Sequence, residues 1–186
     1  MKENIAFNKM IIVAKRYSQA LFELAQNDEE LGQFFNDLKS INTTIDQSVE
    51  LKTFLSHPAF NNETKKEIIK EIFEGKINKN ILNFLYVLID RNRIYALGAI
   101  INHLEELMDK KYNILTVEVI TAIELSYEMK EKLTNKLQNL YQKQIKVKTE
   151  IDEDILGGMM LKIGDKIVDG TIKAKLNNMK RTLIQR

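Results

Sequence analysis

The sequence predicts a mostly α-helical protein, in which a six-helix N-terminal bundle is followed by a small α+β C-terminal domain with a short β-sheet and a terminal helix. Apolar residues recur three and four positions apart through the first 111 of the 186 residues, the spacing of amphipathic helices. At residues 112–113 this spacing changes to the alternation of a β-strand. Four of the seven glycines lie within residues 151–170, where turns between short strands are expected. We therefore predict two domains, residues 1–111 and 112–186.

The first three helices are predicted from periodicity and from the residues at their ends. Asp28 is the expected N-cap of the second helix, because Glu29 and Glu30 follow it and acidic side chains are favourable in a first turn. The third helix is expected to end at His57, since the residue before Pro58 is pushed out of the helical region. The apolar positions that define these helices are Val13, Tyr17, Ala20, Leu21, Leu24, Leu31, Phe34, Phe35, Leu38, Ile41, Ile45, Leu51, Phe54 and Leu55.

Three further helices complete the predicted bundle. Asn61 or Asn62 is expected to cap the fourth helix, and Gly75 is expected to adopt the left-handed conformation that ends it. Residues 78–92 are apolar on nearly every side, so this fifth helix is either central in the bundle or buried on two sides, one of them by a partner protein. The sixth helix, residues 94–111, returns to amphipathic spacing.

The C-terminal domain is predicted from strand-like alternation and from glycine positions. Residues 114–122 and 144–150 alternate as half-buried strands, and Ser126 is expected to cap the helix between them. A hairpin is predicted at residues 159–169, with a break at Gly157-Gly158 and a turn at Gly164-Asp165. Asp169 is expected to accept backbone N–H bonds at the start of the last helix, and Gly170 to allow a tight turn into it. That helix has apolar positions at Ile172, Leu176, Met179 and Leu183.

Composition excludes several classes of protein. The chain has no cysteine, which excludes disulfides and thiolate chemistry, and its net charge of +2 is too small to indicate nucleic-acid binding. The longest apolar run, residues 81–89, is far shorter than the roughly 20 residues of a membrane-spanning helix. Residues 10–14 are followed at once by Lys15 and Arg16, so no signal peptide is expected and the protein is expected to stay in a bacterial cytoplasm.

No catalytic, cofactor or metal site is expected. Gly158 and Gly164 lack the spacing and the following residues of a phosphate-binding loop. Asp152 and Asp154 resemble the start of a calcium loop, but Ile163 occupies its twelfth position, where a carboxylate is required. His57 and His103 each lack a second ligand at metal spacing, so surface or capping roles are expected for them. Surfaces that bind other proteins remain as the expected functional feature.

Four stretches of the chain resemble one known family. The segment Asp152-x-x-Ile-Leu-Gly-Gly-Met-Met-Leu-Lys-Ile-Gly-Asp-Lys-Ile-Val-Asp-Gly170 is similar to the C-terminal signature of the delta subunit of F-type ATP synthase, the oligomycin-sensitivity-conferring protein family. Residues 14–25, 54–60 and 83–94 resemble three further motifs of that family in the same order. One departure is Ser18, where the family usually has a small alanine. The resemblance covers nearly the whole chain.

The resemblance implies a non-catalytic stator subunit of the proton-translocating F-type ATP synthase, one copy per complex, on the cytoplasmic face of the bacterial cell membrane. It implies that domain 1–111 binds the catalytic head and clamps the N-terminal helix of an alpha subunit between its first and fifth helices. By position, the groove would be lined by Tyr17, Ala20, Leu21 and Val87.

The same resemblance implies that domain 112–186 binds the C-terminal ends of the b subunits of the peripheral stalk, with no cofactor and no membrane span of its own. Its structural signature would be Gly157, Gly158, Gly164, Asp169 and Gly170. Composition alone also allows a free-standing helical adaptor that binds amphipathic helices. A third hypothesis is a small hydrolase that uses Asp165 or Asp169.

Overall fold

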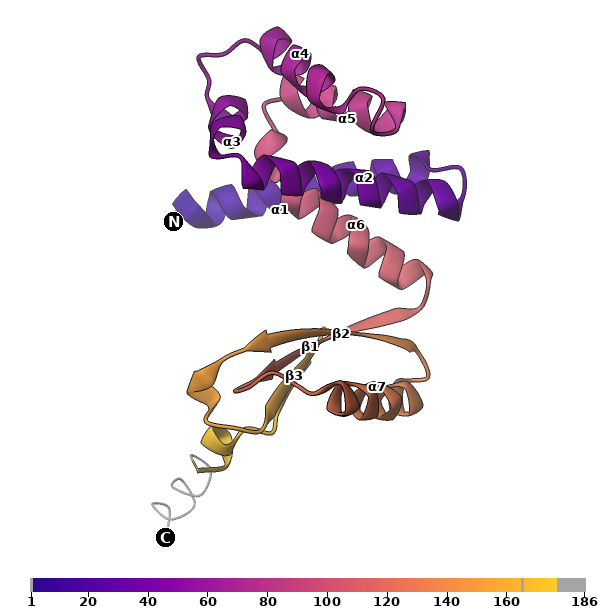
Figure 1. The fold of residues 1–186 in the computed structure, drawn as a ribbon, viewed down its shortest axis with the longest axis vertical. Helices are drawn as coiled ribbons and strands as arrows, with labels where there is room; N and C mark the ends of the chain where they lie inside the picture. The colour runs from indigo at the N-terminus through magenta and orange to yellow at the C-terminus, as the bar shows by residue number, and fades with distance from the viewer. Residues whose placement is uncertain (1, 165, 177–186) are drawn as a thin grey trace. The chain divides into compact units, whose positions relative to one another are not determined.

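The computed structural model describes residues 2–164 and 166–176, and it confirms the predicted fold class. Six α-helices are followed by a four-stranded sheet. Figure 1 draws the chain as a ribbon and labels most of these elements. The chain divides into two compact units, residues 1–108 and 109–186. Within the described part of the chain, no helix combines the length and the apolar composition needed to cross a membrane.

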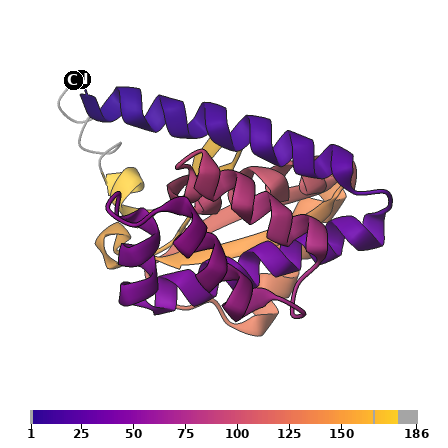
Figure 2. The same ribbon diagram turned by 90° about the horizontal axis from the view of Figure 1, so that it is seen from above.

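The N-terminal unit is built from helices joined by short loops. The long helix α1 lies along one side of this unit, as the view from above shows (Figure 2). The predicted sixth helix begins with a separate 3₁₀ turn, η1. The elements are α1 (Lys2–Leu24), α2 (Asp28–Gln47), α3 (Val49–Ser56), α4 (Asn62–Phe73), α5 (Lys79–Asp90), η1 (Ile94–Ala96) and α6 (Leu97–Lys111).

The helix caps correct one prediction and confirm two others. The N-cap of α2 is Asn27, whose Oδ1 accepts the backbone N–H of Glu30 at 2.8 Å, so the prediction of Asp28 was wrong by one residue. The Asn27 backbone is extended, which leaves its side chain free to fold back over the first turn, whereas Asp28 is already helical. Asn61 caps α4 by accepting the N–H of Thr64 at 2.7 Å, and His57 ends α3 as predicted.

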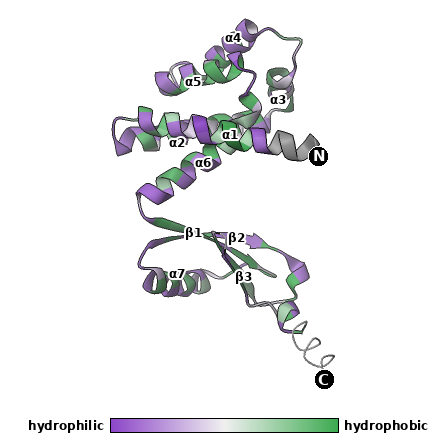
Figure 3. Cartoon of the chain, turned by 180° about the vertical axis from the view of Figure 1, so that it is seen from behind, coloured by the Kyte–Doolittle hydropathy of each residue, from purple (hydrophilic) through white to green (hydrophobic). Residues whose placement is uncertain are grey.

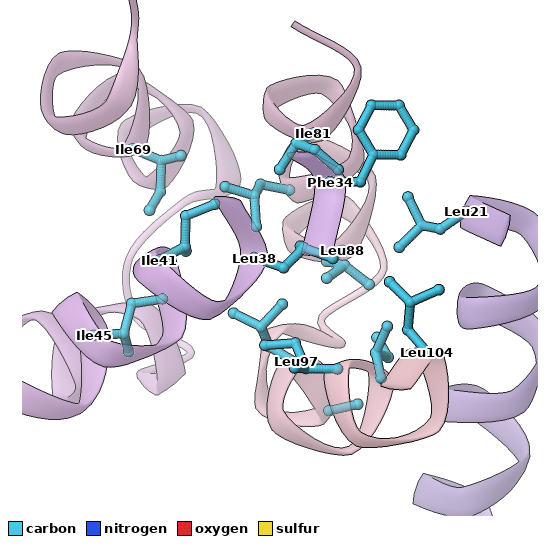
Figure 4. Close-up of a cluster of buried hydrophobic side chains, with 14 of the residues drawn as sticks. Leu21, Phe34, Leu38, Ile41, Ile45, Ile69, Ile81, Leu88, Leu97 and Leu104 are labelled. Atoms are coloured by element: carbon cyan, nitrogen blue, oxygen red, sulfur yellow. The ribbon is translucent and has the colours of Figure 1, made fainter. Parts of the chain in front are cut away.

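The core of the N-terminal unit forms around α2. Its buried residues Leu31, Phe34, Leu38, Ile41 and Ile45 are three and four positions apart, so they share one face of the helix. Side chains from α1, α4, α5 and α6 converge on this face (Figure 4). Each fully buried aliphatic or aromatic side chain contributes roughly 1.5–3 kcal/mol relative to leaving it exposed. The fully buried partners of α2 include Leu21, Ile69, Ile81, Leu85, Leu88, Ile100 and Leu104.

The C-terminal unit contains a mixed sheet with strand order β2-β1-β3-β4. Strands β1 and β2 pair in parallel, and a parallel pair needs a crossover connection, which α7 provides. Strands β3 and β4 form the predicted hairpin. The elements are β1 (Ile114–Thr121), α7 (Tyr127–Tyr141), β2 (Gln144–Ile151), η2 (Glu153–Ile155), β3 (Met159–Ile163) and β4 (Lys166–Asp169).

The two faces of this sheet differ in character. On one face, α7 covers Val117, Val119 and Ile163 with Leu133 and Leu137. On the opposite face, Glu118 of β1 lies directly across from Lys162 of β3, and their side chains pair at 2.9 Å. The hydropathy colouring of Figure 3 marks both hydrophobic and hydrophilic residues along these strands. The alternation of β1 therefore places Val117 and Val119 under the helix and the half-buried Glu118 on the opposite face.

A short helical stretch, residues 172–176, follows β4 where the terminal helix is predicted. Ile172 and Leu176 lie in it, whereas Met179 and Leu183 fall outside the described residues. The start of this helix differs from the prediction in one detail. Thr171 Oγ1 accepts the backbone N–H of Ala174 at 3.1 Å, so Thr171 rather than Asp169 bonds to the first turn.

Candidate protein-binding surfaces

Tyr17 joins α1 to α5 on the surface of the N-terminal unit. Its ring meets that of Phe84 edge-on, with the two ring centroids 5.9 Å apart. Arg93, in the segment after α5, donates a hydrogen bond from Nη1 to Tyr17 Oη at 3.2 Å, and its guanidinium lies 5.7 Å from the centre of the same ring. These contacts hold the half-buried Tyr17 in one orientation between two helices.

The other three residues predicted for the groove have different environments. Ala20 is exposed on α1, and the side chain of Val87 on α5 is 46% exposed. Leu21 is only 1% exposed, because its side chain points into the core beside Phe34 and Leu88 (Figure 4). Leu21 therefore belongs to the core, whereas Ala20 and Val87 are exposed and Tyr17 is half-buried.

Helix α5 buries one face and leaves another in solvent. Ile81, Leu85, Leu88 and Ile89 are buried, while Val87 is exposed. The helix is therefore buried on one side by its own chain and leaves Val87 uncovered, and the second possibility, burial of another side by a partner, stays a prediction.

Two apolar residues adjoin this surface and were not predicted as part of it. Phe84 contacts Tyr17, and Leu24 is exposed one turn after Ala20 on α1. A signal was available in the sequence, because Phe84 precedes Val87 by three residues and Leu24 follows Ala20 by four.

The two histidines have structural roles. His103 of α6 places Nδ1 2.7 Å from the hydroxyl of Ser18 on α1, and the same hydroxyl donates to the carbonyl of Ala14 at 2.8 Å. The expectation of a surface or capping role for His103 was therefore wrong, because it links two helices. His57 caps α3 and accepts the N–H of Ala59 at 3.2 Å. Among the described residues, no group of three acidic or imidazole side chains is arranged to hold a metal ion.

The glycine signature of the C-terminal unit brings two segments into backbone contact. Gly158 has a φ of +79°, and a Cβ at this position would lie 2.6 Å from the carbonyl oxygen of Gly170. The N–H of Gly170 in turn donates to the carbonyl of Met159 at 3.0 Å. Gly157 accepts the N–H of Ile172 at 3.0 Å, and Gly164 lies in the turn between β3 and β4.

Asp169 completes this signature without any feature of a catalytic acid. Its Oδ1 accepts the backbone N–H of Thr171 at 2.9 Å. This backbone bond, together with a bond from the Thr171 hydroxyl, holds the pKa of the carboxyl below its ordinary value. Asp169 therefore stays ionised near neutral pH and orders the turn before the last helix.

The segments joined by these glycines present exposed apolar side chains. Leu156 precedes the glycine pair, and Ile172 and Leu176 lie one turn apart on the following helix. The hydrogen bond between Ile172 and Gly157 brings the two segments together. We call Leu156, Ile172 and Leu176 the C-terminal apolar patch. Exposed apolar clusters of this kind are typical of protein interfaces.

Comparisons with known proteins agree on one family. Residues 13–183 match the family model described as ATP synthase delta (OSCP) subunit. The chain is 36% identical over 172 residues to the ATP synthase subunit delta of Clostridium botulinum strain Langeland, covering 92% of this chain and 96% of that one. The delta subunit of Clostridium perfringens strain SM101 matches with the same identity and coverage.

A solved structure supports the fold. A chain in the Toxoplasma gondii mitochondrial ATP synthase hexamer superposes with a TM-score of 0.70 at 20% sequence identity. The superposition covers 92% of this chain and 97% of that one. The architecture of both units is therefore that of a chain found in an assembled ATP synthase.

Proposed function

The chain belongs to the ATP synthase delta (OSCP) subunit family, and from this premise we propose how its two units bind their partners. A member of this family is a non-catalytic component of the peripheral stalk of F-type ATP synthase. We therefore reject the hydrolase hypothesis. We also reject the free-standing adaptor, because the family is one of subunits of a defined complex.

The N-terminal unit binds the N-terminal helix of an alpha subunit between α1 and α5. The observation that carries this proposal is the uncovered apolar surface of these helices, where Tyr17, Ala20 and Val87 are accessible above the buried Leu21. An amphipathic helix can lay its apolar face into such a groove. The fixed orientation of Tyr17 favours binding, because little side-chain entropy is lost when the partner docks.

The C-terminal unit binds the C-terminal ends of the b subunits. Its C-terminal apolar patch supplies exposed Leu156, Ile172 and Leu176 for this contact. The glycine signature and Asp169 shape the patch through the backbone contacts around Gly158 and Gly170. In this proposal the subunit is present once per complex, on the cytoplasmic face of the bacterial cell membrane.

Two binding surfaces on one chain suit a static tether. A stator has to hold while the rotor exerts torque, so slow dissociation matters more than fast association. When one contact opens, the other keeps the partner at a high effective concentration, which favours rebinding.

The groove is tested by titrating the full chain with a synthetic peptide from the N-terminal end of the alpha subunit of the same organism, using calorimetry. We expect the Val87→Asp variant to bind at least about tenfold more weakly, because docking would bury an unpaired carboxylate. Tyr17→Ala should also weaken binding, since it removes the ring held between α1 and α5.

The matched control is Val49→Asp. Val49 is also exposed in the N-terminal unit, but it is the first residue of α3, where an acidic side chain is favourable. This variant should bind the peptide as the unchanged protein does. Equal affinity of Val87→Asp and Val49→Asp, with both proteins folded by circular dichroism, would refute the groove.

A further inference from the structure

One lysine of the N-terminal unit is buried without a partner among the described residues. Lys65 of α4 is 4% exposed, and it shares the inward face of its helix with Ile69 and Phe73, four and eight residues later. The neighbouring Lys66 is half-buried and pairs with Asp90 at 2.7 Å. The Lys65 ammonium has no such ion pair or side-chain hydrogen bond within the part of the chain that the structure describes.

Lys65 lines a pocket of about 570 Å³, and the other residues around this pocket come mainly from the α3–α4 loop and the segment after α5. The described residues around the pocket include no carboxylate. No buried side-chain nitrogen or oxygen is left unsatisfied among the described residues, so the Lys65 ammonium still reaches solvent. A positive charge is thus held in a nearly buried position beside a pocket whose described lining offers it no counter-charge.

Two aromatic residues line the pocket, and other residues hold one of them, Phe60, in place. Phe60 is 44% exposed and Tyr95 is 59% exposed, and both line the pocket. Phe60 is held by Phe54 and His57, whose ring centroids lie 4.5 Å and 5.7 Å from its own. Asn62 and Asn92 also line this space, and their side-chain amides can donate hydrogen bonds.

We propose that this pocket binds an acidic peptide segment in which an aspartate or glutamate stands next to an apolar residue. The carboxylate pairs with Lys65, and the apolar side chain lies against Phe60 and Tyr95. A charge-assisted hydrogen bond in a partly desolvated site is stronger than one on the open surface. A hydrated inorganic anion gains nothing from the aromatic walls, and a single lysine offers no bidentate contact to phosphate, so the pocket favours a peptide.

The experiment records amide NMR spectra of the full chain during titration with acetyl-Phe-Asp-Leu-amide and, separately, with acetyl-Phe-Asn-Leu-amide. We expect the acidic peptide to shift the signals of Phe60, Lys65 and Tyr95 saturably, with a dissociation constant on the order of millimolar. The asparagine peptide should bind at least about fivefold more weakly, because it keeps the shape but loses the charge.

Two variants test the role of the lysine. Lys65→Met keeps a long apolar stem and should remove the difference between the two peptides. Lys70→Met removes a positive charge from the exposed side of α4 and should preserve the difference in binding between the two peptides. Discrimination that persists in Lys65→Met would overturn the proposal.

Titrations of the unchanged protein test the proposal even if a variant fails to fold. Equal binding of both peptides, or no shift at the pocket from either one, would overturn the proposal. Inorganic phosphate serves as a further probe. If phosphate shifts the same signals as strongly as the acidic peptide, the pocket is a general anion site and the peptide assignment is wrong. A much weaker response to phosphate supports the assignment.

Discussion

At the scale of single residues, the same side chain has different roles according to the helix face it occupies. Lys65 and Lys66 are adjacent in sequence, yet Lys65 is buried with Ile69 while Lys66 pairs with Asp90 of another helix. Successive helical residues point about 100° apart, so neighbours seldom share an environment. Ser18 shows the same effect, because its face of α1 brings its hydroxyl to His103 of α6.

Gly158 should be the least replaceable glycine among those described. We expect Gly158→Ala to lower the free energy of unfolding of the C-terminal unit by at least about 2 kcal/mol, since it combines a left-handed backbone with a Cβ 2.6 Å from a carbonyl oxygen. Urea unfolding, followed through the amide NMR signals of β1, measures this change.

Gly32→Ala is the matched control for this substitution. Gly32 lies inside α2, and a Cβ built there meets nothing within 4 Å. Alanine should therefore raise the free energy of unfolding of the N-terminal unit by roughly 0.5–1 kcal/mol. If Gly158→Ala were as well tolerated as Gly32→Ala, the close contact between the glycine segments would be refuted.

At the scale of the helix or strand, what matters is which faces the chain itself covers and which it leaves uncovered. Helix α5 repeats buried residues at the usual spacing, yet it keeps Val87 exposed. Strand β1 alternates so that one row of residues, with Val117 and Val119, faces α7, while the other row, with Glu118, is half-buried on the opposite face. An element with an apolar surface that its own chain leaves uncovered is where a partner is expected.

Substitutions at the start of α2 test whether Asn27 is its N-cap. Asn27→Ala should destabilise the N-terminal unit by about 1 kcal/mol, because it leaves the N–H of Glu30 without its acceptor. Asn27→Ser keeps an oxygen acceptor at the N-cap and should cost only a few tenths, roughly 0.3 kcal/mol. Thermal unfolding of both variants measures the difference, and an equal loss would show that the side chain of Asn27 is not the cap.

At the scale of the whole molecule, each unit has a hydrophobic core of its own. We expect fragments 1–111 and 112–186 to fold separately, because a compact unit with its own core is the usual unit of folding. Cooperative thermal unfolding of each fragment measures this. The peptide from the alpha subunit should then bind only to the first fragment, and a peptide from the C-terminal end of the b subunits only to the second.

The position of the cut provides a control for this experiment. The hydroxyl of Thr116 donates to Asp109 at 2.7 Å, so a cut after residue 111 removes one contact of the C-terminal unit. A fragment of residues 109–186 keeps that contact and should be slightly more stable. A gradual, non-cooperative transition in both C-terminal fragments would contradict independent folding, as would binding of either peptide to the wrong fragment.

The sequence alone determined the fold class, the order of the elements and the family. Periodicity located the helices and strands because a helix or strand that buries one face must repeat its apolar residues at 3.6 or 2 positions. The glycine pair and the Gly-Asp turn located the hairpin, because few other residues allow such backbone angles.

Only the tertiary structure decided what each face meets. Leu21 and Ala20 are adjacent on α1, and nothing local indicates that Leu21 enters the core while Ala20 stays exposed. The Ser18–His103 bond joins residues 85 positions apart, and the pocket beside Lys65 forms where two distant loops meet. Such contacts depend on how helices pack against one another. The sequence pattern of a single helix does not predict which other elements pack against it.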